Sequence, residues 1–171
     1  MILVRKISYG KWKDHEERIL DEFDADAITS CLRTTDNTLS TWKIESEKEI
    51  TDVYLAIATN SENISKMVLL KIDSEELTKQ GLEFGNTESV TPHKSFSKRH
   101  YDITNLNYNK LGKVAVIIRN QINDEKNIYQ KTKAQVMDLL LTRINNKEID
   151  INDLNDKLRK EIDTYILKNN N

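Results

Sequence analysis

The pattern of apolar and polar positions predicts strands in the first part of the chain. Residues 2–9, ILVRKISY, are rich in β-branched and aromatic side chains, which favours a first strand. Residues 39–44, LSTWKI, alternate as a strand does. Residues 64–73, ISKMVLLKID, form a continuous apolar run that ends in charge. We therefore expect three strands before residue 74.

Helical periodicity appears between these strands. The predicted helices or helical turns are residues 11–24, 25–32, 46–60 and 74–81. Ser46 and Glu49 have the spacing of a capping box, and Ser74 is expected to cap the last of these helices, with Gly81 just past its end. The segment 82–103 has no regular period, so we expect an irregular loop there. Such a long loop in a small domain is often functional.

The last third of the chain has a different pattern. Residues 105–122 are ambiguous, because β-branching favours a strand and flanking polarity favours a helix. Residues 127–144 and 151–167 are both predicted helices, and the second has apolar residues at near-heptad spacing. The short connection between them predicts a helical hairpin. The fold class is therefore α+β, with a mixed sheet and helix unit over 1–122 and a C-terminal hairpin over 123–171.

Composition narrows the classes of function. The chain has 171 residues, of which 32% are charged, but its net charge is only −2. A general polyanion binder needs a basic excess, so contact with nucleic acid is expected only locally, through residues 93–100. One cysteine allows no internal disulfide, and no apolar run is long enough for a signal peptide or a membrane span. We expect a cytoplasmic protein that does not enter a membrane.

One candidate site lies in the segment HKSFSKRHYD, residues 93–102. Histidine can move protons near neutral pH, and neighbouring cations can hold a phosphate. The predicted anion-binding residues are His93, Lys94, Lys98 and Arg99, and His100 is a candidate catalytic residue. The alternative is a solvated basic loop without a ligand, which is common on protein surfaces.

Motifs for cofactors and metals are missing. The chain has four glycines and lacks Gly-x-Gly-x-x-Gly, a phosphate-binding loop and Gly-x-Ser-x-Gly. It also lacks the His-x-x-x-His spacing of a helical zinc pair, and His15 stands among acids on a predicted helix. Cys31 could act as a nucleophile with His93 or His100 as its base, but its apolar neighbours favour burial. We therefore expect no cofactor and no metal.

The stretches LVRKI, TLSTWKI and VLLKIDSEELTKQGLEF loosely resemble the ADP-ribosyltransferase-like domains. The resemblance spans about the first 105 residues. It implies that Arg5 grips the pyrophosphate of NAD and that Ser40 supports the same site. The resemblance gives no clear match for the catalytic glutamate of that family. Glu83, Glu88 and His100 are the candidates for its role.

The stretch LRTTDNTLSTWKI, residues 32–44, gives a direct test of this resemblance. Asp36 and Asn37 are turn residues, and we expect Trp42 to be a buried anchor of the strand that follows. Ser40 shares a strand face with Trp42. If the chain binds NAD, Arg5 and Ser40 must open into one cleft, because an anion clamp works only at contact distance.

Two hypotheses about function follow. The first is a small bacterial or phage interaction protein, an accessory component of an operon-encoded system, with a protein partner or a second copy bound through the C-terminal helices. The second is an enzyme that acts on NAD or on nucleic-acid phosphates through Arg5, Ser40 and the loop from His93 to His100. A cleft that joins Arg5, Ser40 and His100 would favour the enzyme, and a large exposed apolar face on the last helices would favour the interaction protein.

Overall fold

The structure is a computed structural model that describes residues 1–12 and 18–169. It contains one six-stranded sheet with the order β4-β5-β2-β1-β3-β6. Its strands are β1 (Ile2–Ile7), β2 (Leu39–Ile44), β3 (Met67–Asp73), β4 (Glu83–Asn86), β5 (His100–Thr104) and β6 (Ile128–Lys131). β1 pairs antiparallel with β2 and β3, and β5 pairs antiparallel with β2 and β4.

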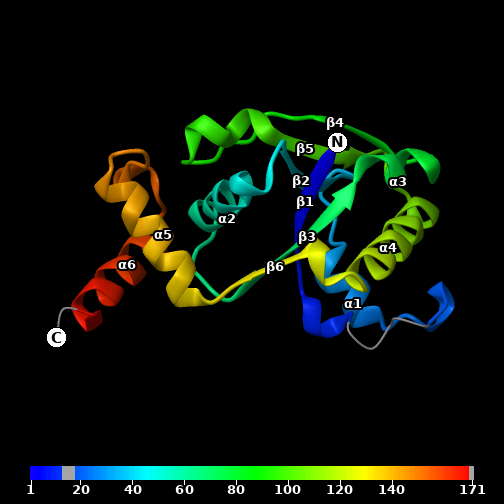
Figure 1. Cartoon of the computed structure of the whole chain (residues 1–171), viewed down its shortest axis with the longest axis horizontal. Helices are drawn as coiled ribbons and strands as arrows, with labels where there is room; N and C mark the ends of the chain where they lie inside the picture. Colours follow the sequence, from blue (N-terminus) through cyan, green and yellow to red (C-terminus); the bar gives the residue numbers. More distant parts are fainter. Residues whose placement is uncertain (13–17, 170–171) are drawn as a thin grey trace. The chain divides into compact units, whose positions relative to one another are not determined.

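Helices fill the intervals between the strands (Figure 1). The α-helices are α1 (Ala25–Cys31), α2 (Ile50–Thr59), α3 (Ser74–Lys79), α4 (Tyr108–Ile122), α5 (Lys133–Asn145) and α6 (Asp156–Asn169). The 3-10 turns are η1 (Tyr9–Lys11), η3 (Leu20–Glu22), η4 (Glu47–Glu49), η5 (Lys94–Arg99), η6 (Glu125–Asn127) and η7 (Ile151–Asp153). The predicted α+β class and the C-terminal helical pair are confirmed.

The described chain divides into two compact units, each built from three segments. Unit 1 consists of Met1–Glu45, Val68–Glu88 and Arg99–Gln130, and unit 2 of Ser46–Met67, Ser89–Lys98 and Lys131–Asn171. The sequence had suggested a single boundary near residue 122, and that boundary stays a prediction. None of the helices in the described part of the chain is long and apolar enough to cross a membrane.

The core of unit 1 lies on one face of the sheet. Every second residue of the inner strands points to this face, so Leu3, Leu39 and Leu70 are buried together. Val114 and Ile118 of α4 are buried in the same cluster, one helical turn apart. The opposite face carries the alternate residues, which include the buried Trp42. The predicted burial of Trp42 is confirmed.

Unit 2 is helical. α2 packs against α5, and α6 lies beside α5, where the Tyr165 hydroxyl donates to Asp138 over 2.8 Å (Figure 1, orange and red). Leu158 and Ile162 of α6 are fully buried, as their spacing predicted. The predicted helix over 127–144 begins later than expected. Thr132 and Gln135 form a capping box that starts α5 at Lys133, and β6 occupies the residues before it.

Two other sequence predictions need correction, and one that was left open is decided. Residues 105–122 are helical over α4, which decides the ambiguity. The segment 82–103, expected to be irregular, contains β4, η5 and β5. These short strands are specified by pairing with β2 and with each other, which a local pattern does not reveal. The helix predicted over 11–24 is represented among the described residues only by the turns η1 and η3.

Side-chain contacts and caps show where several local predictions differ from the structure. Trp12 and Phe23 are both buried and pack edge to face, with 5.9 Å between their ring centroids. His15 lies outside the described residues. Asp73 and not Ser74 caps α3, and Ser46 makes no side-chain capping bond. The predicted turn is confirmed, because Asp36 and Asn37 both have left-handed backbone angles.

Candidate functional site

Arg5 and Ser40 do not form a common clamp. Val4 pairs with Trp42, so Ser40 points to the same face as Val4, and Arg5 points to the other. The Arg5 guanidinium instead donates to two backbone carbonyls, that of Ser40 over 2.5 Å and that of Cys31 over 2.5 and 3.2 Å. The two side chains therefore do not open into one cleft, as the ADP-ribosyltransferase resemblance would require, and a catalytic role for these residues stays a prediction.

The surroundings of Arg5 are those of a structural residue. Burial lowers the pKa of its guanidinium from 12.5 to about 10, and interactions with Cys31 and Asp102 partly oppose this shift. The group therefore stays charged at neutral pH. Cys31 is buried, as its neighbours predicted, and its Sγ accepts hydrogen bonds from the Ser8 amide over 2.9 Å and from Trp12 Nε1 over 3.1 Å. Arg5 thus ties α1 to two strands.

His100 is held in one orientation on the sheet of unit 1. The Thr87 hydroxyl donates to Asp102 Oδ2 over 2.7 Å, so its lone pairs and the Thr87 carbonyl remain as acceptors for His100 Nδ1, at 3.0 and 2.9 Å. Nδ1 therefore carries a proton. Nε2 lies 3.9 Å from Asp102 Oδ1, and the ring packs edge to face on Trp42 at 4.9 Å.

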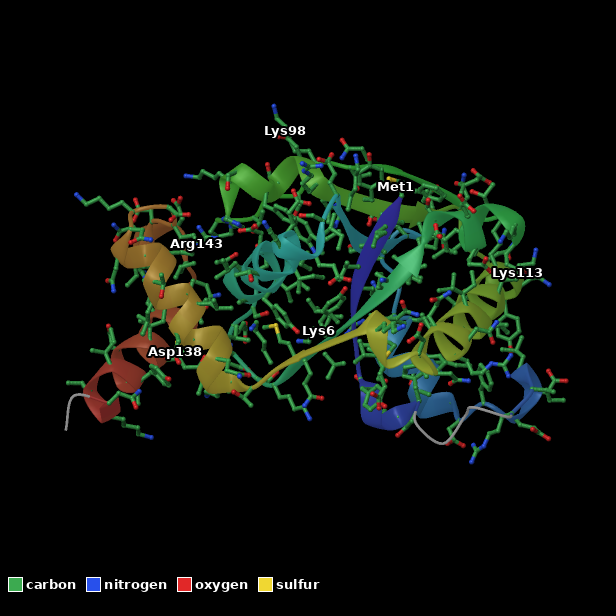
Figure 2. The ribbon with its side chains drawn as sticks, in the orientation of Figure 1. Met1, Lys6, Lys98, Lys113, Asp138 and Arg143 are labelled. Carbon is green, nitrogen blue, oxygen red and sulfur yellow. The ribbon has the colours of Figure 1, made fainter. Side chains whose placement is uncertain are left out.

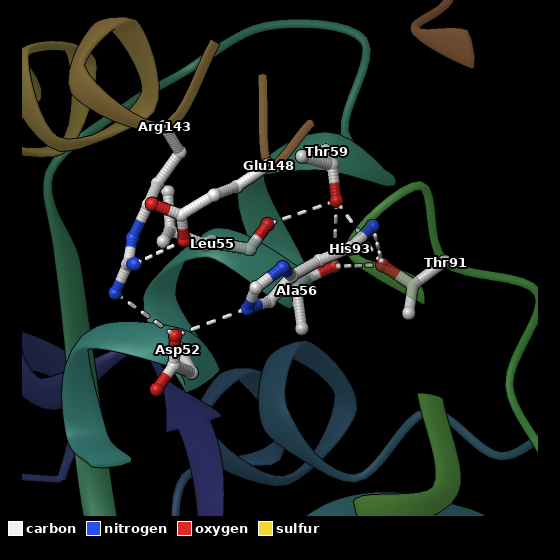
Figure 3. A network of polar contacts seen from close by, with 8 residues as sticks. All are labelled: Asp52, Leu55, Ala56, Thr59, Thr91, His93, Arg143 and Glu148. Atoms are coloured by element: carbon white, nitrogen blue, oxygen red, sulfur yellow. Dashed lines mark hydrogen bonds and ion pairs between the residues drawn. The ribbon is translucent and has the colours of Figure 1, made fainter. Parts of the chain in front are cut away.

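His93 belongs to a different network, in unit 2 (Figure 3). Its side chain is only 3% exposed and stacks on Phe96, and Nε2 lies 3.1 Å from Asp52 Oδ1. The same carboxylate oxygen lies 3.4 Å from Arg143, which also pairs with Glu148. Among the described residues, His93 Nδ1 has no hydrogen-bond partner. His93 therefore contacts α2 through Asp52, and Asp52 in turn joins α2 to Arg143 of α5.

The three cations of the predicted anion site do not share a free surface. Lys94 pairs with Asp153 over 2.5 Å, which raises the pKa of the lysine. Arg99 lies 2.5 Å from Glu45, and its hydrogen bond lowers the pKa of that carboxyl to about 2. Figure 2 shows Lys98 pointing away from the ribbon. Two of the three charges are thus already balanced by carboxylates, which leaves the anion-binding role of this segment a prediction.

An apolar groove in unit 1 is the feature that the sequence did not reveal. It has a volume of about 430 Å³ and lies between α1 with its preceding turn and the start of α4. Its apolar lining includes Leu20, Phe23, Ile28, Tyr108, Leu111 and Gly112. Tyr108 is 94% exposed, Leu20 is 38% exposed, and the neighbouring Ile19 is 63% exposed. Ile19, Leu20 and Phe23 fit one apolar stripe of the helix predicted over 11–24, but that pattern does not indicate that they lie beside Tyr108 and Leu111.

Gly112 determines how closely the two walls of the groove approach. A Cβ atom at this position would come within 2.8 Å of Leu20 Cδ2. Because glycine has no Cβ, the Leu20 side chain lies directly on the α4 backbone. Asp21 and Asn109 add polar atoms to the lining.

A second cavity, of about 370 Å³, lies in unit 2 and is lined by Thr59, Thr91, Lys94, Asp153 and others. The hydroxyls of Thr59 and Thr91 already bond each other at 3.1 Å. Neither cavity includes Arg5, Ser40 or His100. Among the residues that the structure describes, no group of three or more His, Cys, Asp or Glu could hold a metal ion.

Comparisons with known protein families, with curated proteins and with solved structures found no match to this chain.

Proposed function

We propose that this chain is a small interaction protein that binds a segment of a protein partner in the groove of unit 1. The observation that carries the proposal is the exposure of Tyr108 and Leu20 at an apolar groove large enough for several side chains. A side chain as large as tyrosine gains free energy by burial, and exposed apolar surface around a groove is typical of binding sites.

The groove supports this proposal better than the C-terminal helices do. The apolar stripe of α5 and α6 is turned inward, with Val136, Leu140, Leu158 and Ile162 buried. Along the described part of these two helices, Ile166 and Leu167 are the large hydrophobic residues that are exposed. We expect the partner to be encoded in the same operon, as an accessory role in a bacterial or phage system implies.

Photocrosslinking in the host that produces the protein tests the proposal. A photoreactive amino acid at Tyr108 should capture the partner, because this side chain stands at the rim of the groove. The matched control places the same amino acid at Asn123, which is exposed at the other end of α4. The captured protein is then purified, and its affinity is measured for the wild type and for Ala25→Arg, which places a large side chain at the groove.

The expected result is one adduct specific to position 108 and a loss of affinity in Ala25→Arg. Equal adducts from positions 108 and 123 would contradict the proposal, as would unchanged affinity in the variant. Circular dichroism of each variant establishes that the fold is kept.

A further inference from the structure

The charges around the groove have one predominant sign. The segment from Leu20 to Asp26 carries four carboxylates, at Asp21, Glu22, Asp24 and Asp26. Arg18 pairs with Asp24 over 3.2 Å, and Lys11 pairs with Asp26 over 3.4 Å. Asp21 lines the groove itself. Within the described part of this segment these cations offset two of the four charges, and Asp21 and Glu22 leave it net negative.

On the opposite wall, Arg119 of α4 lies outside the groove lining, 5.9 Å from the centroid of the Phe23 ring, and donates to the Arg18 carbonyl over 2.7 Å. The lining residues of the groove on α4 are uncharged. The two lysines of this turn are engaged elsewhere, Lys110 with Glu83 over 2.9 Å and Lys113 with the Gln80 carbonyl over 2.8 Å. An occupant therefore meets apolar side chains on both walls and a carboxylate on one rim.

The walls also indicate the shape of the occupant. α1 and the start of α4 form the two sides, so the groove has the helical walls that accept an amphipathic helix. Such a helix presents apolar anchors at i, i+3 and i+4 to the groove and polar residues at its border. A lysine or arginine at that border is complementary to Asp21.

We propose that the partner segment is a basic amphipathic helix whose apolar face enters the groove and whose lysine or arginine pairs with Asp21. This inference rests on the proposed function, because it names the chemistry of the partner at the same site. A second copy of the chain is the competing occupant.

Designed peptides test the charge preference without knowledge of the partner. The probes are two short fluorescent helical peptides, one of leucine and lysine and one of leucine and glutamate, with the same pattern. Fluorescence anisotropy with the full chain should show tighter binding of the lysine peptide at low salt. The difference should shrink at high salt, because the Debye length falls to about 3 Å at 1 M.

Two variants locate the binding. Asp21→Asn should weaken binding of the lysine peptide about fivefold at low salt, as expected for one partly exposed ion pair. Tyr108→Ser should weaken both peptides, because it removes apolar surface from the rim. The matched control is Glu125→Gln, which removes one exposed charge outside the groove and should leave binding unchanged.

Three outcomes would overturn the inference. Equal affinity for the two peptides removes the charge preference, and equal effects of Asp21→Asn and Glu125→Gln remove the site. A concentration-dependent dimer that Tyr108→Ser abolishes would make a second copy the occupant. Failure of the crosslink in the host, with the peptides behaving as expected, would refute the proposed function and leave the binding preference of the groove intact.

Discussion

His93 and His100 are seven residues apart in the sequence, yet they belong to different units and have different surroundings. In unit 2, His93 is almost fully buried, and its Nε2 lies 3.1 Å from Asp52 Oδ1 on α2. In unit 1, His100 Nδ1 donates to the Thr87 carbonyl, and Nε2 lies 3.9 Å from the buried oxygen Asp102 Oδ1. The surroundings of a histidine, and not its place in a basic segment, therefore determine which residues its ring nitrogens contact.

The largest loss of stability is expected from a substitution in the apolar core of unit 2. This loss is the standard against which the polar network around His93 is compared. Leu158→Ala should lower the free energy of unfolding by about 2–5 kcal/mol, because it removes a fully buried side chain and leaves a cavity. Chemical denaturation measures the change. Leu167→Ala on the same helix is the matched control, because Leu167 is 67% exposed and its truncation should have little effect. Equal losses in the two variants would contradict the burial of α6.

The buried network should come next. Asp52→Ala removes the acceptor of both His93 and Arg143, and we expect a loss of about 1–3 kcal/mol because a buried donor then lacks its partner. Denaturation curves of the variant and of Asp163→Ala give the comparison. Asp163 is exposed on α6, so its loss should change the free energy of unfolding by less than about 0.5 kcal/mol. If Asp52→Ala behaves like the control, His93 does not stabilise unit 2.

A substitution in the cluster of Thr87, His100 and Asp102 in unit 1 should have a smaller effect on stability. Its effect on the ring of His100 should be easier to detect. Thr87→Val removes the hydroxyl that bonds His100 and Asp102, and we expect a loss of about 1 kcal/mol. The nitrogen resonances of the ring report the tautomer directly. The signal of His100 should shift in this variant while that of His93 stays unchanged. A shift of both, or of neither, would show that the two clusters do not differ as described.

The smallest effect on stability is expected from the exposed ion pair between Arg99 and Glu45, beside His100. The hydrogen bond from Arg99 lowers the pKa of Glu45 from 4.5 to about 2, so this carboxylate stabilises the folded state above its unfolded pKa. The contribution should be lost as the pH falls from about 5 to about 2. Melting temperatures of the wild type and of Glu45→Gln should therefore differ slightly at neutral pH and converge in acid. A difference that grows toward low pH would have the wrong sign.

Much of the fold could be predicted from local patterns, and the errors have specific causes. The apolar run before Asp73 predicted β3, and the spacing of Leu158 and Ile162 predicted the buried face of α6, because each pattern reports burial within one element. β4 and β5 were missed because their residues become strands only by pairing with distant partners. The turn at Asp36 and Asn37 was found because its chemistry is local.

The candidate sites show the same division. His93, His100, Arg5 and Ser40 were recognised by residue type, but type alone said nothing about which side chains meet. The register of β1 with β2 placed Arg5 and Ser40 on opposite faces, and a shift of one residue would have reversed that result. The groove could not be predicted, because Leu20 and Tyr108 come from segments that the fold alone brings together.

By itself, the sequence determined the α+β class, the strand β1, the helical pair at the end of the chain and the burial of Trp42. These features follow from side-chain volume, hydrophobicity and periodicity over short stretches, which act in the same way in any surroundings. Only the tertiary structure decided the partners of the two histidines, the structural role of Arg5 and the groove beside Gly112. The reason is physical: hydrogen bonds, ion pairs and cavities depend on distances between residues far apart in the chain, and pairing and packing set those distances.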